Sequence, residues 1–292
     1  MQLITRLDFD GVVCAAMISA METIHEIEFS NPKDVEDRMV EIDFGDALVH
    51  LPFHPDASIW FQNREPSNVA ESLLKNVRGK FENAPSTARL VLDYYKSPDL
   101  ARYEKIVDEV DRIQSANLTK DDIMSPKGWV MLSYTLDPRF MQEREYGVYL
   151  IELLREGKTV DEILANEPVA KRVKRYLGDE EKYSQVLGTH TKVQGNVIIT
   201  DFRDLTDQPH GNRFYVFTKF PDANVHIRLD QLDRMRVKAS VSKSIINKTC
   251  KIDIGNLMEE FGGGGVAGAG ACLLGTRTAD TRIAQIVDKL KS

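Results

Sequence analysis

The sequence predicts an α/β protein with two lobes, a parallel-sheet α/β lobe followed by a smaller α/β lobe, and a ligand cleft between them. Short apolar strands alternate with helical stretches in roughly the first third of the chain. Apolar residues then recur at helical spacing from about residue 100 to residue 177, and β-rich segments separated by turn residues follow from about residue 185. We therefore expect a first domain at residues 1–180 and a second domain at residues 190–292.

The first lobe opens with a strand, a sharp turn and a helix, which is the usual start of a layered α/β fold. Its predicted strands lie at residues 2–7, 47–51 and 58–61, and its predicted helices lie at residues 12–21, 69–77 and 84–95. In the second lobe, helices at residues 254–261 and 278–290 are expected on either side of a glycine run.

Composition narrows the class of protein. The 292 residues are 42% apolar and 28% charged, which is typical of a soluble globular protein, and the net charge of −7 argues against general binding of duplex nucleic acid or of an anionic membrane. The chain shows neither a signal peptide nor a membrane-spanning apolar run, so we expect a cytoplasmic protein. Its three cysteines fit neither a zinc spacing nor a disulfide framework.

Two acids stand at the end of the first predicted strand, in the segment TRLDFDG. Asp8 and Asp10 alternate in an extended stretch before a glycine turn, so both carboxylates can reach one divalent cation. The alternative is structural, because Asp10 can cap the helix expected at residues 12–21. The sequence leaves both interpretations open.

A second motif is the glycine run FGGGGVAGAG. Successive glycines can turn their backbone N–H groups toward an anion, and we expect Gly263, Gly264 and Gly265 to contact a ligand in this way. A simple tight turn is the alternative. Arg277 follows the run and is a candidate phosphate contact.

Taken together, these features resemble the DHH phosphoesterase superfamily, in particular its exopolyphosphatase-related branch, with a second lobe similar to the DHHA1 domain. The resemblance spans nearly the whole chain and is carried by the segments LITRLDFDGVVCA, GDALVHLPFHP, NAPSTARLVLDYY, DIMSPKGWVMLSYTLDPR and FGGGGVAGAGAC.

The resemblance implies a catalytic centre in which acids and histidines hold two Mn²⁺ or Mg²⁺ ions that activate a water for hydrolysis. Asp8 and Asp10 match the first family motif, and Asp46 matches the acid of the second. The acid of the fourth motif matches Asp108 or Asp111, of which we prefer Asp108.

Two motifs depart from the family pattern. The Asp-His-His triad is replaced by Gln62, Asn63 and Arg64, and Val266 stands where the glycine loop should carry a histidine. Amide oxygens are weak metal ligands, and a guanidinium cannot bind a metal at all. Arg64 is expected to lie among the acids as a counter-ion, to bind a phosphate, or to point into solvent.

His50 and His54 follow Asp46 closely in the sequence. We expect ordinary loop histidines, and the alternative is that one of them enters the site as a replacement metal ligand.

The expected function is binding of a phosphate-bearing small molecule or short oligonucleotide in the cleft, with hydrolytic activity impaired or lost and no metal required. One alternative is an active Mn²⁺- or Mg²⁺-dependent hydrolase of oligonucleotides, nucleotides or polyphosphate. A second alternative is a structural homo-oligomer that reuses the fold for self-assembly.

Overall fold

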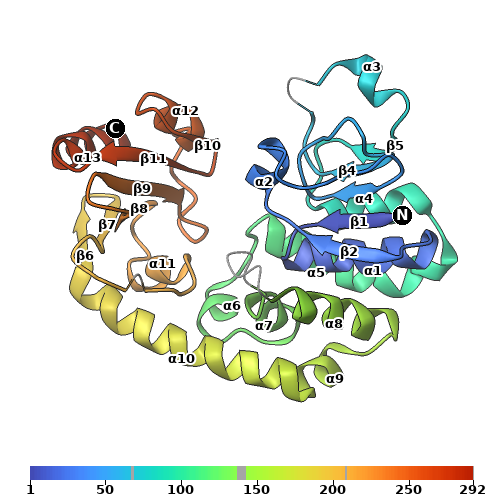
Figure 1. Cartoon of the computed structure of the whole chain (residues 1–292). Helices are drawn as coiled ribbons and strands as arrows, with labels where there is room; N and C mark the ends of the chain where they lie inside the picture. Colours follow the sequence, from blue (N-terminus) through green and yellow to red (C-terminus); the bar gives the residue numbers. More distant parts are fainter. Residues whose placement is uncertain (67–68, 137–142, 208, 292) are drawn as a thin grey trace. The chain divides into compact units, whose positions relative to one another are not determined.

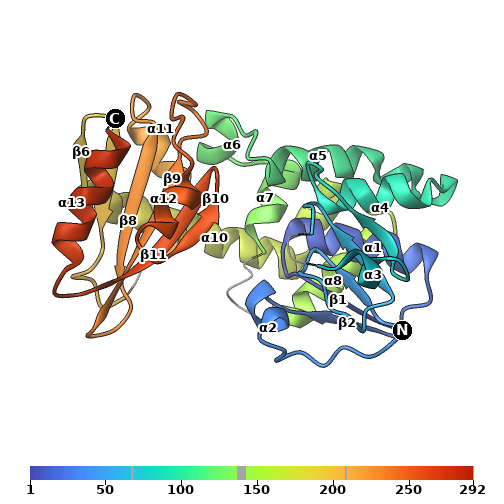
Figure 2. The same ribbon diagram turned by 90° about the horizontal axis from the view of Figure 1, so that it is seen from above.

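The computed structural model describes residues 1–66, 69–136, 143–207 and 209–291 (Figures 1 and 2). The chain forms two compact units, Met1–Asn117 with Pro126–Lys174, and Leu118–Ser125 with Arg175–Ser292. The division after Lys174 falls within helix α10 (Glu167–His190), a few residues before the boundary predicted between residues 180 and 190. The segment Leu118–Ser125 belongs to the second unit although it precedes this division in the sequence. The stretch predicted to be helical between residues 100 and 177 includes residues 137–142, which lie outside the described residues.

Sheet A of the first unit has five strands in the described part of the chain, in the order β2-β1-β3-β4-β5 (Figure 1). All its neighbouring strands run parallel, which confirms the predicted parallel sheet. The strands are β1 (Gln2–Thr5), β2 (Glu26–Phe29), β3 (Ala47–Val49), β4 (Ile59–Gln62) and β5 (Arg78–Phe81).

The strand order creates a topological switch point between β1 and β3. After β1 the chain adds β2 on one side, and it then crosses to add β3 on the other side. In open α/β sheets, ligands bind outside the carboxyl ends of the strands at such a point. The residues that follow β1 and β3 are therefore the first candidates for a functional site.

The core of the first unit lies on both faces of sheet A. On one face, apolar side chains that include Leu3, Val49 and Phe61 pack against helices. On the other face, Ile4 and Trp60 belong to a smaller cluster, to which the short helices at residues 32–36 and 71–74 also contribute. The helices of the larger cluster are α1 (Phe9–Met21), α4 (Thr87–Tyr95), η1 (Pro98–Tyr103), α5 (Glu104–Gln114), α7 (Gly128–Tyr134), α8 (Arg144–Arg155), α9 (Val160–Ala165) and the first part of α10.

Two short helices complete the first unit, α2 (Pro32–Glu36) and α3 (Glu71–Leu74). The second of these occupies only part of the helix predicted at residues 69–77. Helix α1 is buried from Phe9 to Ile18, which explains why its sequence is apolar on all sides.

Sheet B of the second unit has six strands among the described residues, in the order β10-β11-β9-β8-β7-β6. Only the β7–β8 pair is parallel within this described sheet. The strands are β6 (Thr191–Gln194), β7 (Val197–Asp201), β8 (Val225–Gln231), β9 (Arg236–Lys243), β10 (Gly264–Val266) and β11 (Ala269–Gly275).

One face of sheet B packs against α12 (Ile254–Glu259) and α13 (Ala279–Leu290), which lie together on that side in Figures 1 and 2. Short helices α6 (Lys120–Met124) and α11 (Tyr215–Lys219) also belong to this unit. Within the described ranges, no helix combines the length and the apolar character needed to cross a bilayer.

Candidate functional site

Asp8 lies in the turn that joins β1 to α1 and is the N-cap of α1. Its Oδ1 accepts a hydrogen bond of 3.0 Å from the backbone N–H of Gly11. A side chain at Gly11 would lie 2.1 Å from the carbonyl oxygen of Arg6, so only glycine allows this tight turn. The capping role predicted for Asp10 therefore belongs to Asp8.

Asp10 is fully buried and binds the amino end of a different helix. Its Oδ2 accepts a hydrogen bond of 2.9 Å from the N–H of Thr87, and its Oδ1 accepts one of 2.7 Å from the N–H of Ala88, both in the first turn of α4. The amino end of a helix attracts anions, and here the chain supplies its own carboxylate.

His50 joins these two acids across the switch point. It follows the last residue of β3, and its ring lies between the carboxylates, with Nε2 3.4 Å from Asp8 Oδ2 and Nδ1 3.4 Å from Asp10 Oδ2. We call Asp8, Asp10 and His50 the acid–histidine cluster. The expectation of an ordinary loop histidine is therefore wrong for His50. His54 does not join the cluster and lies 3.6 Å from Asp56.

A hydrogen-bonded chain fixes the ring of His50. The Asn63 amide nitrogen donates to the carbonyl of Ala84, which turns its oxygen toward Thr87. The Thr87 hydroxyl donates to that oxygen and lies 2.7 Å from His50 Nδ1. Because this hydroxyl proton is used, Nδ1 must be the donor to Thr87.

The cluster shifts the pKa of each of its members. Burial lowers the pKa of His50, but the charges of Asp8 and Asp10 outweigh burial, and the net pKa is raised. Burial alone would raise the pKa of Asp8, yet His50, Arg6 and the Gly11 N–H together lower it to about 2. For Asp10, burial prevails and the pKa is raised. These directions favour a protonated ring beside an ionised Asp8.

Two of the three residues in the triad position, Gln62 and Asn63, bond to the protein around them. Gln62 Oε1 accepts a hydrogen bond from the N–H of Asn63, and Asn63 is used to hold Thr87. Arg64 is exposed, and the positive side chains that contact the acids are Arg6, 3.3 Å from Asp8, and His50. The counter-ion position predicted for Arg64 is therefore filled by other residues.

Asp46 does not lie with Asp8 and Asp10. It precedes β3, whereas the cluster follows the carboxyl ends of β1 and β3, so Asp46 stands at the opposite edge of sheet A. The four-residue step from Asp46 to His50 spans about 13 Å along a strand. Its two oxygens accept backbone hydrogen bonds of 2.9 Å from Gln2 and Asp43. The prediction that it joins the other acids is wrong.

The two candidates for the fourth-motif acid both lie on α5 and pair with Arg89 of α4. Asp108 is 69% exposed at its side chain, whereas that of Asp111 is 18% exposed. Asp111 Oδ1 accepts a hydrogen bond of 2.6 Å from Ser86, the N-cap of α4 and the neighbour of Thr87. Asp111 therefore binds the N-cap of the helix whose first turn holds Asp10, and which of the two acids belongs to the fourth motif stays a prediction.

The glycine run forms a hairpin packed on α12. A side chain at Gly263 would lie 2.1 Å from the carbonyl oxygen of Ala271, and one at Gly265 would lie 2.3 Å from that of Ala269. Gly264 has no neighbour within 4 Å of such a side chain. Close backbone approach accounts for Gly263 and Gly265, and ligand binding by these glycines stays a prediction.

Val266 ends the first strand of the hairpin, β10, and Arg277 follows the second, β11. Val266 pairs with Ala269 at the start of β11 and is 45% exposed, where the family pattern has histidine. Arg277 follows the end of β11 and is exposed. Gly264 and Gly265 pair with Ala271 and Gly270 of β11, so Arg277 stands several residues further along that strand. Its role as a phosphate contact stays a prediction.

The donor set does not fit the two-ion centre that the resemblance implies. Both oxygens of Asp10 accept backbone hydrogen bonds, and Gln62 and Asn63 offer only neutral amides at the triad position. Throughout the residues that the structure describes, no group of three or more His, Cys, Asp or Glu side chains is arranged to hold a metal ion.

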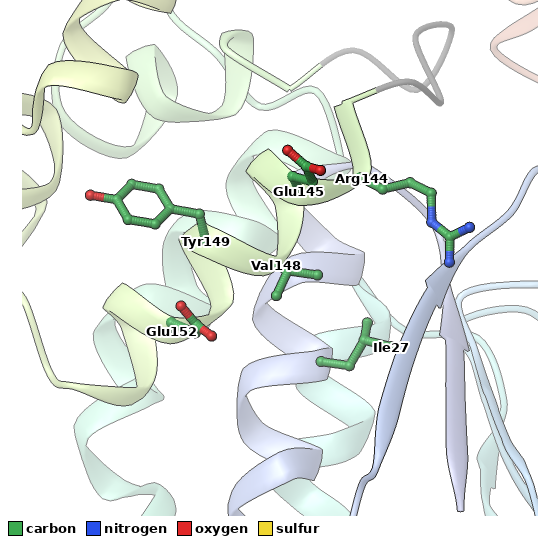
Figure 3. A pocket seen from close by; sticks show the side chains of 6 residues that line it. All are labelled: Ile27, Arg144, Glu145, Val148, Tyr149 and Glu152. Atoms are coloured by element: carbon green, nitrogen blue, oxygen red, sulfur yellow. The ribbon is translucent and has the colours of Figure 1, made fainter.

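A separate pocket of about 420 Å³ lies between edge strand β2 and helix α8 (Figure 3). It is lined by Ile27, Arg144, Glu145, Val148, Tyr149 and Glu152. None of the predicted site residues is among them, so the pocket is distinct from the acid–histidine cluster.

Comparison with solved structures gives several full-length matches. The pGpG-specific phosphodiesterase PggH from Vibrio cholerae is 29% identical, with 98% of both chains covered and a TM-score of 0.83. The DHH domain of a protein described as a member of a ribosomal protein family is 13% identical, covering 100% of this chain and 86% of that one, with a TM-score of 0.64.

RecJ from Thermus thermophilus, solved in complex with Mn²⁺, is 12% identical over 98% of this chain and 51% of its own, with a TM-score of 0.55. No protein-family model and no curated protein matches the sequence. The likeness to PggH over nearly the full length of both chains confirms the predicted fold class, a parallel-sheet α/β domain followed by a second α/β domain.

Proposed function

We propose that this chain, whose fold is that of the DHH superfamily, binds a linear phosphorylated dinucleotide of the pGpG type without hydrolysing it efficiently. The ligand class is supported by the similarity to PggH, whose name records its specificity for pGpG. A ligand of this kind agrees with the phosphate-bearing small molecule expected from the sequence, and it needs only a local cationic site on an acidic protein.

The observation that carries the loss of hydrolysis is the triad position, where Gln62, Asn63 and Arg64 stand in place of an acid and two histidines. Hydrolysis with two ions needs enough anionic and imidazole ligands to hold both ions and a water activated between them. Gln62 and Asn63 supply only neutral amides, which already bond to the protein.

Two arginines support binding of a phosphate at the same edge of sheet A. Arg6 follows β1, and Arg64 follows β4 and is exposed. A guanidinium binds phosphate through two parallel hydrogen bonds, which gives both affinity and orientation. Because Arg64 is a fixed cation in the triad position, it suits a phosphate better than a metal.

Calorimetric titration of the purified chain with pGpG tests the proposal, together with chromatography of the mixture after incubation with Mn²⁺ or Mg²⁺. We expect saturable binding and no turnover above that of a protein-free control. Arg64→Ala should weaken binding roughly tenfold, which corresponds to about 1.4 kcal/mol. Turnover that a chelator abolishes would refute the loss of hydrolysis, and absence of binding would refute the ligand class.

Arg78→Ala is the matched control for Arg64→Ala. Arg78 begins β5 at the amino edge of the same sheet and pairs with Glu22 at 3.0 Å. Its removal should leave the affinity for pGpG unchanged, because a ligand at the carboxyl edge does not reach it. Equal weakening by both variants would indicate a nonspecific effect of net charge.

A further inference from the structure

We propose that the edge of sheet A at β2 binds an extended segment of a partner protein in which basic and apolar residues alternate. In this arrangement, the segment pairs with β2 as an added strand and places an apolar side chain in the pocket between β2 and α8. The surface is distinct from the acid–histidine cluster, so this proposal does not depend on the proposed function.

Strand β2 forms one edge of sheet A. Among the described residues it pairs with β1 alone, and the strand order of the sheet ends with it. An edge strand turns one row of backbone N–H and C=O groups away from its sheet, and such a row is a template for an added strand. Because the pocket lies beside this strand, one segment can form main-chain hydrogen bonds and fill the pocket together.

The pocket supplies the apolar contact. Ile27 of β2 and Val148 of α8 both line it, and Figure 3 shows their side chains next to each other between the strand and the helix. Both side chains are half-buried and pack against the larger core cluster, which holds them in place. The pocket volume of about 420 Å³ leaves room for an aliphatic side chain of a bound segment.

Acidic residues lie on both faces of this edge. Glu145 and Glu152 line the pocket from α8, and both are exposed. Glu26 and Glu28 flank Ile27 in β2, so their side chains point to the opposite face of the sheet from the pocket. A strand added to β2 therefore meets an apolar pocket on one face and two carboxylates on the other. Alternating apolar and basic residues match these two faces.

The same charges argue against a second copy of this chain as the occupant. An antiparallel pair of β2 strands centred on Ile27 places Glu26 of each copy opposite Glu28 of the other. Like charges directly opposite each other destabilise a sheet. The pocket lining itself carries two glutamates and one cation, Arg144, so it also favours a basic partner.

The test is fluorescence anisotropy of a labelled synthetic peptide, Lys-Val-Lys-Val-Lys-Val-Lys, titrated with the purified chain. We expect saturable binding that Glu26→Lys weakens roughly tenfold, because an attraction across the strand pair becomes a repulsion. Val148→Gln should also weaken binding, because it places a polar group in the apolar pocket. The isomer Lys-Lys-Lys-Lys-Val-Val-Val should bind roughly tenfold more weakly, since its side chains do not alternate between the two faces.

Glu82→Lys is the matched control for Glu26→Lys. Glu82 directly follows β5, which is the other edge strand of sheet A, and it is exposed. The same change of charge at this place should leave the affinity for the peptide unchanged. Circular dichroism shows whether each variant is folded, and the comparison of the two peptides needs the wild type alone.

Hydrogen exchange locates the bound peptide. The alternating peptide should slow amide exchange in β2, because an added strand protects the outward N–H groups. Absence of peptide binding, equal affinity for the two peptides, or equal weakening by Glu26→Lys and Glu82→Lys would each overturn the proposal. So would sedimentation of the chain alone as a dimer that Val148→Gln dissociates, since the occupant would then be a second copy.

Discussion

Asp8→Asn removes a single charge from the acid–histidine cluster and changes little else. Asparagine is as good an N-cap as aspartate, so α1 keeps its cap. What is lost is the attraction of Asp8 to His50 at 3.4 Å and to Arg6 at 3.3 Å. The change in unfolding free energy therefore reports these charge interactions.

The size of the effect follows from the pKa of Asp8, which falls from its ordinary 3.8 to about 2 in the folded protein. Because one pKa unit corresponds to about 1.4 kcal/mol, Asp8→Asn should destabilise the protein by about 2 kcal/mol at neutral pH. The carboxyl group is only 18% exposed, so solvent screening reduces this value little.

Urea unfolding followed by circular dichroism measures the difference. The stabilisation from a carboxylate with a lowered pKa is fully present above 3.8 and is lost as the pH falls through about 2. The difference in the free energy of unfolding between the wild type and Asp8→Asn should therefore become smaller in acid. Asp56→Asn, which alters an Asp–His contact with an exposed aspartate, is the control and should change stability little. An unchanged stability in Asp8→Asn at neutral pH would refute the reasoning.

Three further predictions follow from other contacts. The pKa of His50 is raised above its ordinary 6.5 in the folded protein. The free energy of unfolding of the wild type should therefore fall as the pH rises from 6.5 through the pKa of His50 in the folded state. Urea unfolding of His50→Asn should show no such decline. Asp46→Ala should cost about 2 kcal/mol in urea unfolding, because two backbone N–H groups lose a charged acceptor, and should leave pGpG affinity unchanged. Gly263→Ala should lower the free energy of unfolding by about 1 to 3 kcal/mol, because the added methyl group clashes with the carbonyl oxygen of Ala271. Gly264→Ala adds its methyl group in open space and should not lower stability. Thermal unfolding of the two variants measures the difference.

The sequence predicts the central strands of sheet A well and misses its edges. Strands β1, β3 and β4 are nearly all buried, so apolar runs mark them. Strands β2 and β5 read EIEF and RGKF, and most of their residues are only partly buried or exposed. An edge strand has a neighbouring strand on one side only and often carries charged residues, so its composition resembles that of a loop.

The site was predicted in part because Asp46 was placed by its resemblance to a motif acid and not by the predicted strands. Asp8 and Asp10 follow β1, as expected, and reach the carboxyl edge of the sheet. The strand predicted at residues 47–51 begins at Ala47, as β3 does, so Asp46 precedes it and lies at the amino edge. Which edge of a sheet a residue reaches depends on how the strands pair, and no local motif records that pairing.

The same limit explains why His50 escaped prediction. Its place beside Asp8 depends on two facts that no local pattern contains, the end of β3 at Val49 and a left-handed φ of +58° at the next residue. Once β3 pairs in parallel with β1, the residues after both strands share one edge, and a histidine there meets the acids.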